Sequence, residues 1–237
     1  MMCVNVVQKI PTGCKFIDKA LNGGFSSGSL SLIYGEPETG KTTMAIQCAV
    51  NCARQGHKTL FIDCDATFYT KRLAQIASGK FEETAELIFL MRPKNFEEQT
   101  LVIDGLAEYL TERFGLVVVD TMTSLYRAKI AESPKKTFEL NRELNRQLAL
   151  LAQIAKTHKI AVLMTSQVRS VFNETYVSVE PVATRVLKFW AEIIIAMKPT
   201  EKPQVIKATL EKTPYTTQHT TWFLRIGEKG LCEHLTS

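Results

Sequence analysis

The segment GEPETGKTT, residues 35–43, constrains the fold of this chain more than any other stretch. It fits the pattern G-x-x-x-x-G-K-[ST], and it stands between an apolar, strand-like run (29–35) and a helical pattern that ends at Gly56. Gly35 and Gly40 let the backbone curl so that its N–H groups face inward, where they and the positive end of the helix attract phosphate. The sequence therefore predicts a strand, a phosphate-binding loop and a helix in direct succession.

Individual side chains give this loop the chemistry of a nucleotide site. We expect Lys41 to reach the β and γ phosphates of ATP, and the Thr42 hydroxyl to ligate Mg²⁺. Asp120 ends the apolar run 116–120, a position from which an acid holds the Mg²⁺ shell in proteins with a phosphate loop. The residues predicted to bind the nucleotide through this loop are Gly35, Glu36, Pro37, Glu38, Thr39, Gly40, Lys41, Thr42 and Thr43.

Apolar runs and helical patterns alternate along most of the chain. Further strands are expected at 59–63, 87–91, 116–120 and 160–167, and helices at 68–78, 96–115 and 133–159. Continuous apolar strands that alternate with helices are typical of a mostly parallel sheet with helices on both faces. The later runs favour strands joined by short turns, at 184–199, 203–212 and 220–230. We expect these to extend the same sheet in antiparallel fashion, within one α/β domain over residues 1–237.

Composition and short sequence patterns argue against a secretion signal, a membrane span and a zinc site in this chain. Hydrophobic residues make up 45%, and the formal charge of +5 permits nucleic acid binding without requiring it. The start of the chain lacks the pattern of a secretion signal, and the most apolar run, 190–197, is too short to span a bilayer. The six cysteines include no C-x2-C pair, which argues against a zinc site and suits a reducing compartment. We expect a cytoplasmic protein.

Two acids, Asp63 and Asp65, stand at the end of the strand expected at 59–63. In an open parallel sheet, ligands lie beyond the carboxyl ends of the strands. We therefore expect Asp65 to face the nucleotide from an adjacent strand, where a carboxylate can orient the attacking water. Asp63 is expected to be a structural residue that caps the loop.

In this order, the motifs resemble the RecA/RadA recombinase superfamily and, more narrowly, the short archaeal paralogues of RadA. The segments that carry the resemblance are 10–42, 60–73, 117–130 and 160–169, so it covers nearly the whole chain. It implies a RecA-like P-loop ATPase core that binds ATP and DNA in DNA repair and homologous recombination. It also implies that Gln167 senses the γ-phosphate and that Arg72 borders the adenine, although an ordinary surface arginine is the alternative for Arg72.

Three departures from the family pattern shape the expected activity. The water-activating residue of the family is Glu, whereas Asp65 is shorter by one methylene, and a displacement of roughly 1 Å can cost on the order of 10²-fold in rate. Only about ten residues precede the core, without the N-terminal helix–hairpin–helix domain or docking segment of RadA-type recombinases. The segment 168–181 is shorter than the DNA loop of the family. We expect slow or negligible ATP hydrolysis, no long filament, and a role in assisting RadA.

Basic and aromatic side chains are candidates for DNA contact. Within 168–181, a cation beside aromatic residues suits single-stranded DNA, with a plain surface loop as the alternative. Lys135 and Lys136 follow Ser133 and Pro134, which are expected to start a helix, so a polyanion docked there would relieve their conflict with the helix dipole. Ordinary solvated charges are the alternative for these and the other cations. The candidate residues are Arg127, Lys129, Lys135, Lys136, Arg169, Phe172, Tyr176 and Arg185.

The expected partners are single-stranded DNA, bound through phosphate without sequence preference, and, by resemblance, the RadA recombinase and a Holliday-junction resolvase. The resemblance also implies association with the nucleoid, and it leaves a homo-oligomer open. Two other functions stay open. A KaiC-like ATPase or kinase has the same core, but such proteins tend to have two adjacent glutamates where this chain has Asp65. An active DNA-dependent recombinase is the third reading, against which the absent N-terminal domain argues.

Overall fold

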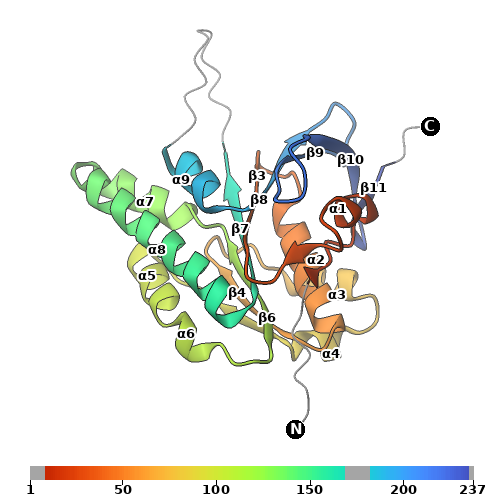
Figure 1. Ribbon diagram of the computed structural model, residues 1–237, viewed down its shortest axis with the longest axis horizontal. Coiled ribbons are helices and arrows are strands. Elements are labelled where there is room, and N and C mark those ends of the chain that lie inside the picture. The colour runs from red at the N-terminus through yellow and green to blue at the C-terminus, as the bar shows by residue number, and fades with distance from the viewer. Residues whose placement is uncertain (1–8, 169–181, 235–237) are drawn as a thin grey trace.

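The computed structural model describes residues 9–168 and 182–234, which are built around a twisted central sheet (Figure 1). Its parallel strands are β3 (Leu30–Gly35), β4 (Lys58–Asp63), β5 (Ile88–Met91), β6 (Phe114–Asp120), β7 (Ala161–Gln167) and β8 (Ile193–Pro199). The antiparallel strands are β9 (Val205–Lys212), β10 (Thr220–Gly227) and β11 (Gly230–Glu233). The strand order is β11-β10-β9-β8-β3-β7-β6-β4-β5. The expected mostly parallel sheet with an antiparallel C-terminal extension is confirmed.

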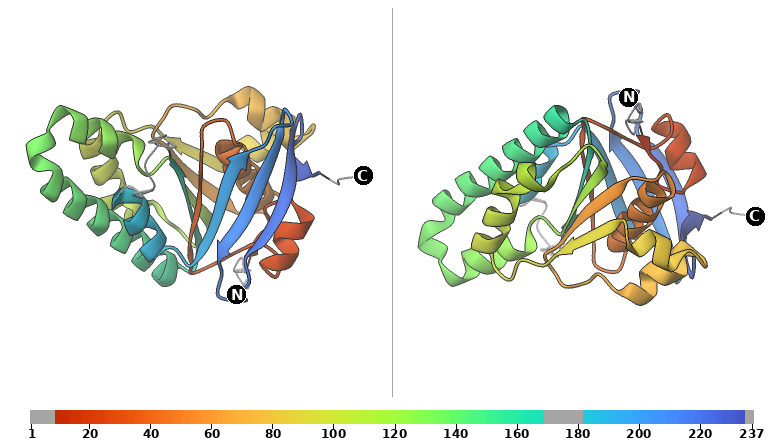
Figure 2. Two further views of the ribbon diagram at one scale, coloured as in Figure 1. Left: turned by 90° about the horizontal axis from the view of Figure 1, so that it is seen from above. Right: turned by 90° about the horizontal axis from the view of Figure 1, so that it is seen from below.

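Helices cover both faces of the sheet (Figure 2). One face carries α1 (Lys15–Ala20), α2 (Lys41–Arg54), α3 (Thr70–Ala77) and α4 (Phe81–Ala85). The other face carries α5 (Phe96–Asp104), α6 (Leu106–Tyr109), α7 (Ser124–Glu132), α8 (Thr137–His158) and α9 (Val182–Trp190). A short ribbon of β1 (Lys9–Ile10) and β2 (Phe25–Ser26) adds apolar side chains to the α2 side. In the part of the chain that the structure describes, none of the helices is long and apolar enough to cross a membrane.

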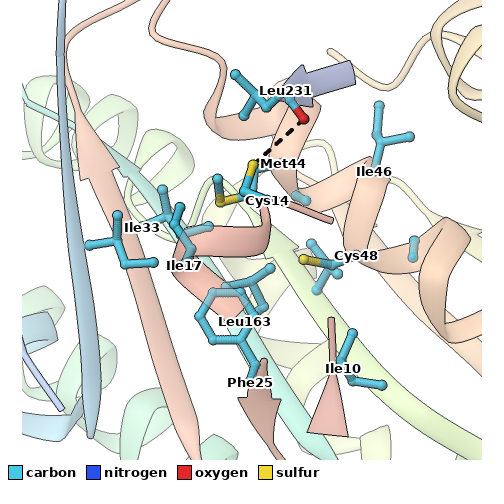
Figure 3. Close-up of a cluster of buried hydrophobic side chains, with 14 of the residues drawn as sticks. Ile10, Cys14, Ile17, Phe25, Ile33, Met44, Ile46, Cys48, Leu163 and Leu231 are labelled. Carbon is cyan, nitrogen blue, oxygen red and sulfur yellow. Dashed lines mark hydrogen bonds between the residues drawn. The ribbon is translucent and has the colours of Figure 1, made fainter. Parts of the chain in front are cut away.

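Side-chain alternation along the buried strands supplies two separate cores. Ile33 of β3 packs with α2, whereas Leu32 packs on the opposite face with α8. Figure 3 shows the first core, where Met44 and Cys48 of α2 lie near Ile33 and Leu163 of β7. Each fully buried side chain of this size stabilises the fold by about 1.5–3 kcal/mol relative to its exposed state. The apolar strand runs are continuous because both faces of the sheet are covered.

Four of the described cysteines behave as small apolar residues. Within the described residues, Cys14, Cys48, Cys52 and Cys64 are free and buried, and Cys232 is exposed. Burial raises the pKa of the Cys52 thiol to about 11, which keeps it neutral near physiological pH. The described ranges contain no group of three or more His, Cys, Asp and Glu side chains that could hold a metal ion.

The parallel register gathers the ends of several strands at one edge of the sheet. Gly35 at the end of β3 lies opposite Gln167 of β7 on one side and Met197 of β8 on the other. Asp63 of β4 lies opposite Asp120 of β6. The expected neighbour relation of β4 and the strand before the phosphate loop is wrong, since β6 and β7 stand between β4 and β3. Asp63 at the end of β4 therefore lies beside Asp120, and two strands separate it from the strand before the phosphate loop.

The region after residue 181 departs from the expected strand over 184–199. Residues 182–190 form the helix α9, and the strand β8 begins only at Ile193. Leu187 is buried whereas Arg185 and Phe189 are exposed, which is the spacing of a helix with one face toward α8. The strand part coincides with the β-branched run Ile193–Ile195, where both faces of the sheet are covered.

Two other expectations about helices need correction, and one helix was not expected. The helix expected at 96–115 breaks at Gly105 into α5 and α6, and β6 already begins at Phe114. The helix expected at 133–159 is preceded by a 3₁₀ turn at Pro134–Lys136, so that α8 begins at Thr137. The segment after β6 forms α7, which no apolar stripe in the sequence indicated; only Tyr126 of this helix is buried.

Candidate functional site

The phosphate loop joins β3 to α2 in a curled conformation. Gly35 has no room for a side chain, because a Cβ atom there would lie 2.0 Å from the carbonyl oxygen of Met197. Gly40 is the N-cap of α2 and has a left-handed backbone with φ of 84°. A cavity of about 250 Å³ opens beside the loop. Its lining residues are Glu38, Gly40, Lys41, Thr42, Thr43 and Ile226.

Lys41 is a buried cation at the start of α2. Its ammonium group donates to the carbonyl of Glu36 at 2.5 Å and to the Thr39 hydroxyl at 3.4 Å. Burial lowers the pKa of Lys41 to about 8, and the nearby carboxylates of Asp120 and Asp65 only partly oppose this effect. The loop thus holds a lysine that lacks a full counter-charge, which is the arrangement that an anionic ligand completes.

Asp120 presents an oxygen atom that the described protein atoms leave unsatisfied. One carboxylate oxygen accepts from the Thr165 hydroxyl, whereas Oδ2 is buried without a hydrogen-bond partner. Burial raises the pKa of Asp120, and the neighbouring hydroxyls of Thr165 and Thr42 oppose this rise. A buried carboxylate oxygen beside a threonine hydroxyl offers the hard oxygen donors that Mg²⁺ prefers, and Mg²⁺ commonly uses one or two carboxylates together with phosphate and water. The residues present therefore fit that ion.

The two acids that follow β4 have different surroundings. Asp63 is buried, and its carboxylate accepts from the backbone N–H groups of Thr67 (2.9 Å) and Phe68 (3.1 Å) and from Nε of Arg92 (3.0 Å). It is a structural residue that holds the loop after β4, as expected. Asp65 is exposed, and its Oδ2 accepts from the Thr121 hydroxyl at 2.9 Å. Asp65 therefore lies beside the end of β6, at Thr121, the residue that follows Asp120 in the chain.

Gln167 ends β7 directly beside the phosphate loop. Its register partner is Gly35, and the following N–H, of Val168, donates to the Gly35 carbonyl at 3.1 Å. The preceding residue, Ser166, shares a 3.0 Å hydrogen bond with the hydroxyl of Thr123. Gln167 is thus placed between the loop and the start of the segment 169–181, which lies outside the described residues.

Arg72 borders a second, larger cavity of about 770 Å³. Its Nη1 donates to the Glu228 carbonyl at 2.9 Å and to the Gln75 side chain at 3.2 Å, while Nη2 is buried without a partner. Most of the other lining residues come from the hairpin of β10 and β11, which sequence reasoning did not assign to the site. No sequence motif predicts that this hairpin lies at the phosphate loop, because the two segments meet only in the folded chain. The lining residues are Thr43, Arg72, Gln204, Arg225, Ile226, Gly227, Glu228, Lys229, Gly230, Leu231 and Cys232.

The described candidates for DNA contact lie on α7, in the turn before α8 and on α9. Lys135 and Lys136 are exposed in the 3₁₀ turn before α8, and Arg185 is exposed on α9. Lys129 on α7 is already paired, with its ammonium 2.6 Å from Glu97 and 3.7 Å from Glu132. Arg127 is half-buried on the same helix. The other candidates, Arg169, Phe172 and Tyr176, fall outside the described residues.

Comparisons with known proteins identify a family and several relatives of this chain. The Rad51 family matches residues 4–233. The DNA repair and recombination protein RadB of Thermococcus kodakarensis is 34% identical over 94% of this chain and 98% of its own length. RadB of Methanococcus maripaludis is 30% identical over 91% of this chain and 96% of its own length.

A solved structure resembles the fold as well. The crystal structure of the RadB recombinase superposes with a TM-score of 0.81 at 33% identity, covering 95% of this chain and 100% of that one. The expected resemblance to the short archaeal paralogues of RadA is therefore confirmed. The chain belongs to the Rad51 family, in its RadB branch.

Proposed function

We propose that this chain is an ATP-binding accessory protein of DNA repair and homologous recombination, which binds DNA and assists a RadA-type recombinase while hydrolysing ATP slowly or not at all. The observation that carries the proposal is the pair of incompletely satisfied buried groups at the phosphate loop, Lys41 and Asp120. The names of the relatives, DNA repair and recombination protein RadB, support the biological setting.

The two cavities support a nucleotide that spans both. They share Thr43 and Ile226 in their linings, so a triphosphate in the smaller one would continue directly into the larger one. Lys41 would bind the β and γ phosphates, and Thr42 with Asp120 would hold Mg²⁺, which neutralises phosphate charge when bound. Arg72 would border the base with its unpartnered Nη2 group.

The slow hydrolysis follows from the placement of Asp65. Its carboxylate is exposed and engaged by Thr121, and it belongs to a side chain that is one methylene shorter than glutamate. A base must lie within hydrogen-bond reach of the water whose proton it attracts. Gln167, opposite Gly35, would report the state of the γ-phosphate to the segment that follows it.

DNA contact is assigned to the cations on the α7–α8 side and to the segment after Gln167. Lys135, Lys136 and Arg185 are exposed, and Arg169 with Phe172 and Tyr176 would add a cation and aromatic surfaces for single-stranded DNA. Binding to RadA and to a Holliday-junction resolvase belongs to the same proposal, on the family resemblance alone.

ATP-dependent DNA binding tests the proposal. Fluorescence anisotropy of labelled single-stranded DNA should show tighter binding with Mg²⁺ and ATP than with Mg²⁺ alone. Lys41→Ala should remove this difference, whereas Lys156→Ala, at an exposed lysine of α8, should retain it. A wild-type protein that binds neither ATP nor DNA would contradict the proposed function.

A further inference from the structure

The hairpin of β10 and β11 rests on the phosphate loop, although the two segments are far apart in the sequence. Ile226 and Leu231 are register partners across this hairpin, so their side chains share one face. A Cβ atom placed on Gly40 would lie 3.3 Å from a methyl carbon of each of them. The hairpin therefore touches the loop with two apolar side chains, while its turn lines the larger cavity.

Gln47 attaches this hairpin to the helix that begins in the loop. Its Nε2 donates to the Leu231 carbonyl at 3.1 Å, and its Oε1 accepts from the Leu231 N–H at 2.8 Å. Gln47 is only 6% exposed, so water cannot easily replace either bond. Gly230 allows this approach, because a Cβ atom there would lie 2.3 Å from Oε1 of Gln47.

The position of Gln47 on α2 links this attachment to the nucleotide site. Gln47 follows Thr43 by one helical turn, so the two side chains lie on the same side of α2. Thr43 lines both cavities, and Leu231 lines the larger one. At the other end of the turn, Arg72 holds the Glu228 carbonyl at 2.9 Å. The wall of the larger cavity is thus fixed from both α2 and α3.

We propose that Gln47 is a positioning residue for the nucleotide, which it serves by holding the β10–β11 hairpin as a wall of the cavity that receives the nucleoside. The inference rests on the proposed function, because it assigns the larger cavity to that part of ATP. A side-chain amide suits the role, since a single group both donates and accepts. An apolar side chain would leave the N–H of Leu231 buried without a partner and its C=O with only the Cys14 thiol, at 3.5 Å, so the hairpin would shift away from α2.

The test separates the two halves of the nucleotide. Gln47→Met preserves the length of the side chain and removes both hydrogen bonds. Isothermal titration calorimetry with Mg²⁺ should compare ATP with inorganic tripolyphosphate, which probes the phosphate loop without a nucleoside. We expect the variant to bind ATP about tenfold more weakly, which corresponds to the net free energy of one or two hydrogen bonds. Its affinity for tripolyphosphate should change little.

Asn51→Leu is the matched control. Asn51 lies one turn further along α2, donates to the Pro11 carbonyl at 2.9 Å and accepts from Arg54 at 3.0 Å, so its replacement also removes two hydrogen bonds but does not touch the hairpin. This control should lower thermal stability as Gln47→Met does, but it should keep the wild-type ratio of ATP to tripolyphosphate affinity. The inference is overturned if Gln47→Met keeps the wild-type ratio of ATP to tripolyphosphate affinity, whether both affinities fall equally or neither falls. The proposed function would then remain intact.

A measurement on the wild-type protein covers the case in which Gln47→Met does not fold. Hydrogen–deuterium exchange should show that ATP protects the amides of residues 226–232 more strongly than tripolyphosphate does. Equal protection by the two ligands would contradict the inference alone. A wild-type protein that binds neither ligand would contradict the proposed function and the inference together.

Discussion

Lys41 and Asp120 are buried side chains whose charges the protein compensates only in part. The Lys41 ammonium is bonded to a carbonyl and a hydroxyl, and Oδ2 of Asp120 has no partner among the described atoms. Burial disfavours the charged form of each group, which lowers the pKa of one and raises that of the other. A ligand that supplies both an anion for Lys41 and a cation for Asp120 would complete the site, as the proposed function requires.

ATP affinity should fall as the pH rises above about 8, near the pKa of Lys41 in the free protein. Bound triphosphate favours the charged lysine and raises its pKa, so above this pH binding must take up a proton and becomes weaker. Calorimetry in two buffers of different ionisation enthalpy measures this uptake directly. Proton release on binding at pH 8.5 would contradict the assignment of Lys41 as the phosphate ligand.

Replacing Asp63 should lower the free energy of unfolding more than replacing an acid at the surface. Asp63→Ala leaves two backbone N–H groups and Arg92 without their buried acceptor, so we expect the free energy of unfolding to drop by about 3 kcal/mol. Asp104→Ala is the control, because that carboxylate pairs with Arg146 at the surface and should cost less than about 1 kcal/mol. Urea unfolding followed by circular dichroism gives both values; equal losses would show that Asp63 is not structural.

Helix α9 shows where local patterns mislead at the scale of elements. The run Trp190–Met197 is apolar except for Glu192, so alternation cannot locate the boundary between helix and strand within it. Burial resolves the ambiguity, since Leu187 faces α8 and the residues from Ile193 onward enter the sheet. Similarly, the helix expected at 96–115 has Gly105 in its interior, whereas α5 ends at Asp104 with Gly105 as its C-cap.

Substitutions along α9 should show the period of a helix. Leu187→Ala removes a buried side chain and should cost about 2–4 kcal/mol of unfolding free energy, whereas Phe189→Ala, at an exposed position, should change it by less than about 0.5 kcal/mol. In a strand these two residues would share one face and the costs would be similar. Thermal or urea unfolding of the two variants distinguishes the cases.

For the whole molecule, the sequence predicted the mostly parallel sheet and the strand, loop and helix around residues 35–43, because both depend on local signals. Buried parallel strands are continuous apolar runs, and the loop between Gly35 and Gly40 needs specific residues at fixed spacing. The β10–β11 hairpin has no such signal, because Ile226 and Leu231 meet Gly40 only through the antiparallel extension of the sheet. Gln47 in the same way reads as an ordinary helix residue until its partner Leu231 is known.

Salt dependence should identify the cations that contact DNA. Lys135→Ala and Lys136→Ala should each weaken binding of single-stranded DNA and reduce the slope of log affinity against log salt by roughly 0.7 per lost phosphate contact. Lys129→Ala should change the slope little, because Glu97 and Glu132 already neutralise this lysine. Anisotropy titrations at several salt concentrations check both; a larger change for Lys129→Ala would reverse the assignment.

ATP turnover tests the central claim most directly, measured for the wild-type protein and for Asp65→Glu with and without single-stranded DNA. The proposed accessory function predicts slow turnover with little stimulation by DNA, and a gain on the order of 10²-fold when the longer acid restores the missing reach. Gln55→Glu, which adds an acid at the far end of α2, should show no gain. Robust DNA-stimulated turnover by the unaltered protein would contradict the claim, because Asp65 would then be adequate as the catalytic acid of an active recombinase-type ATPase.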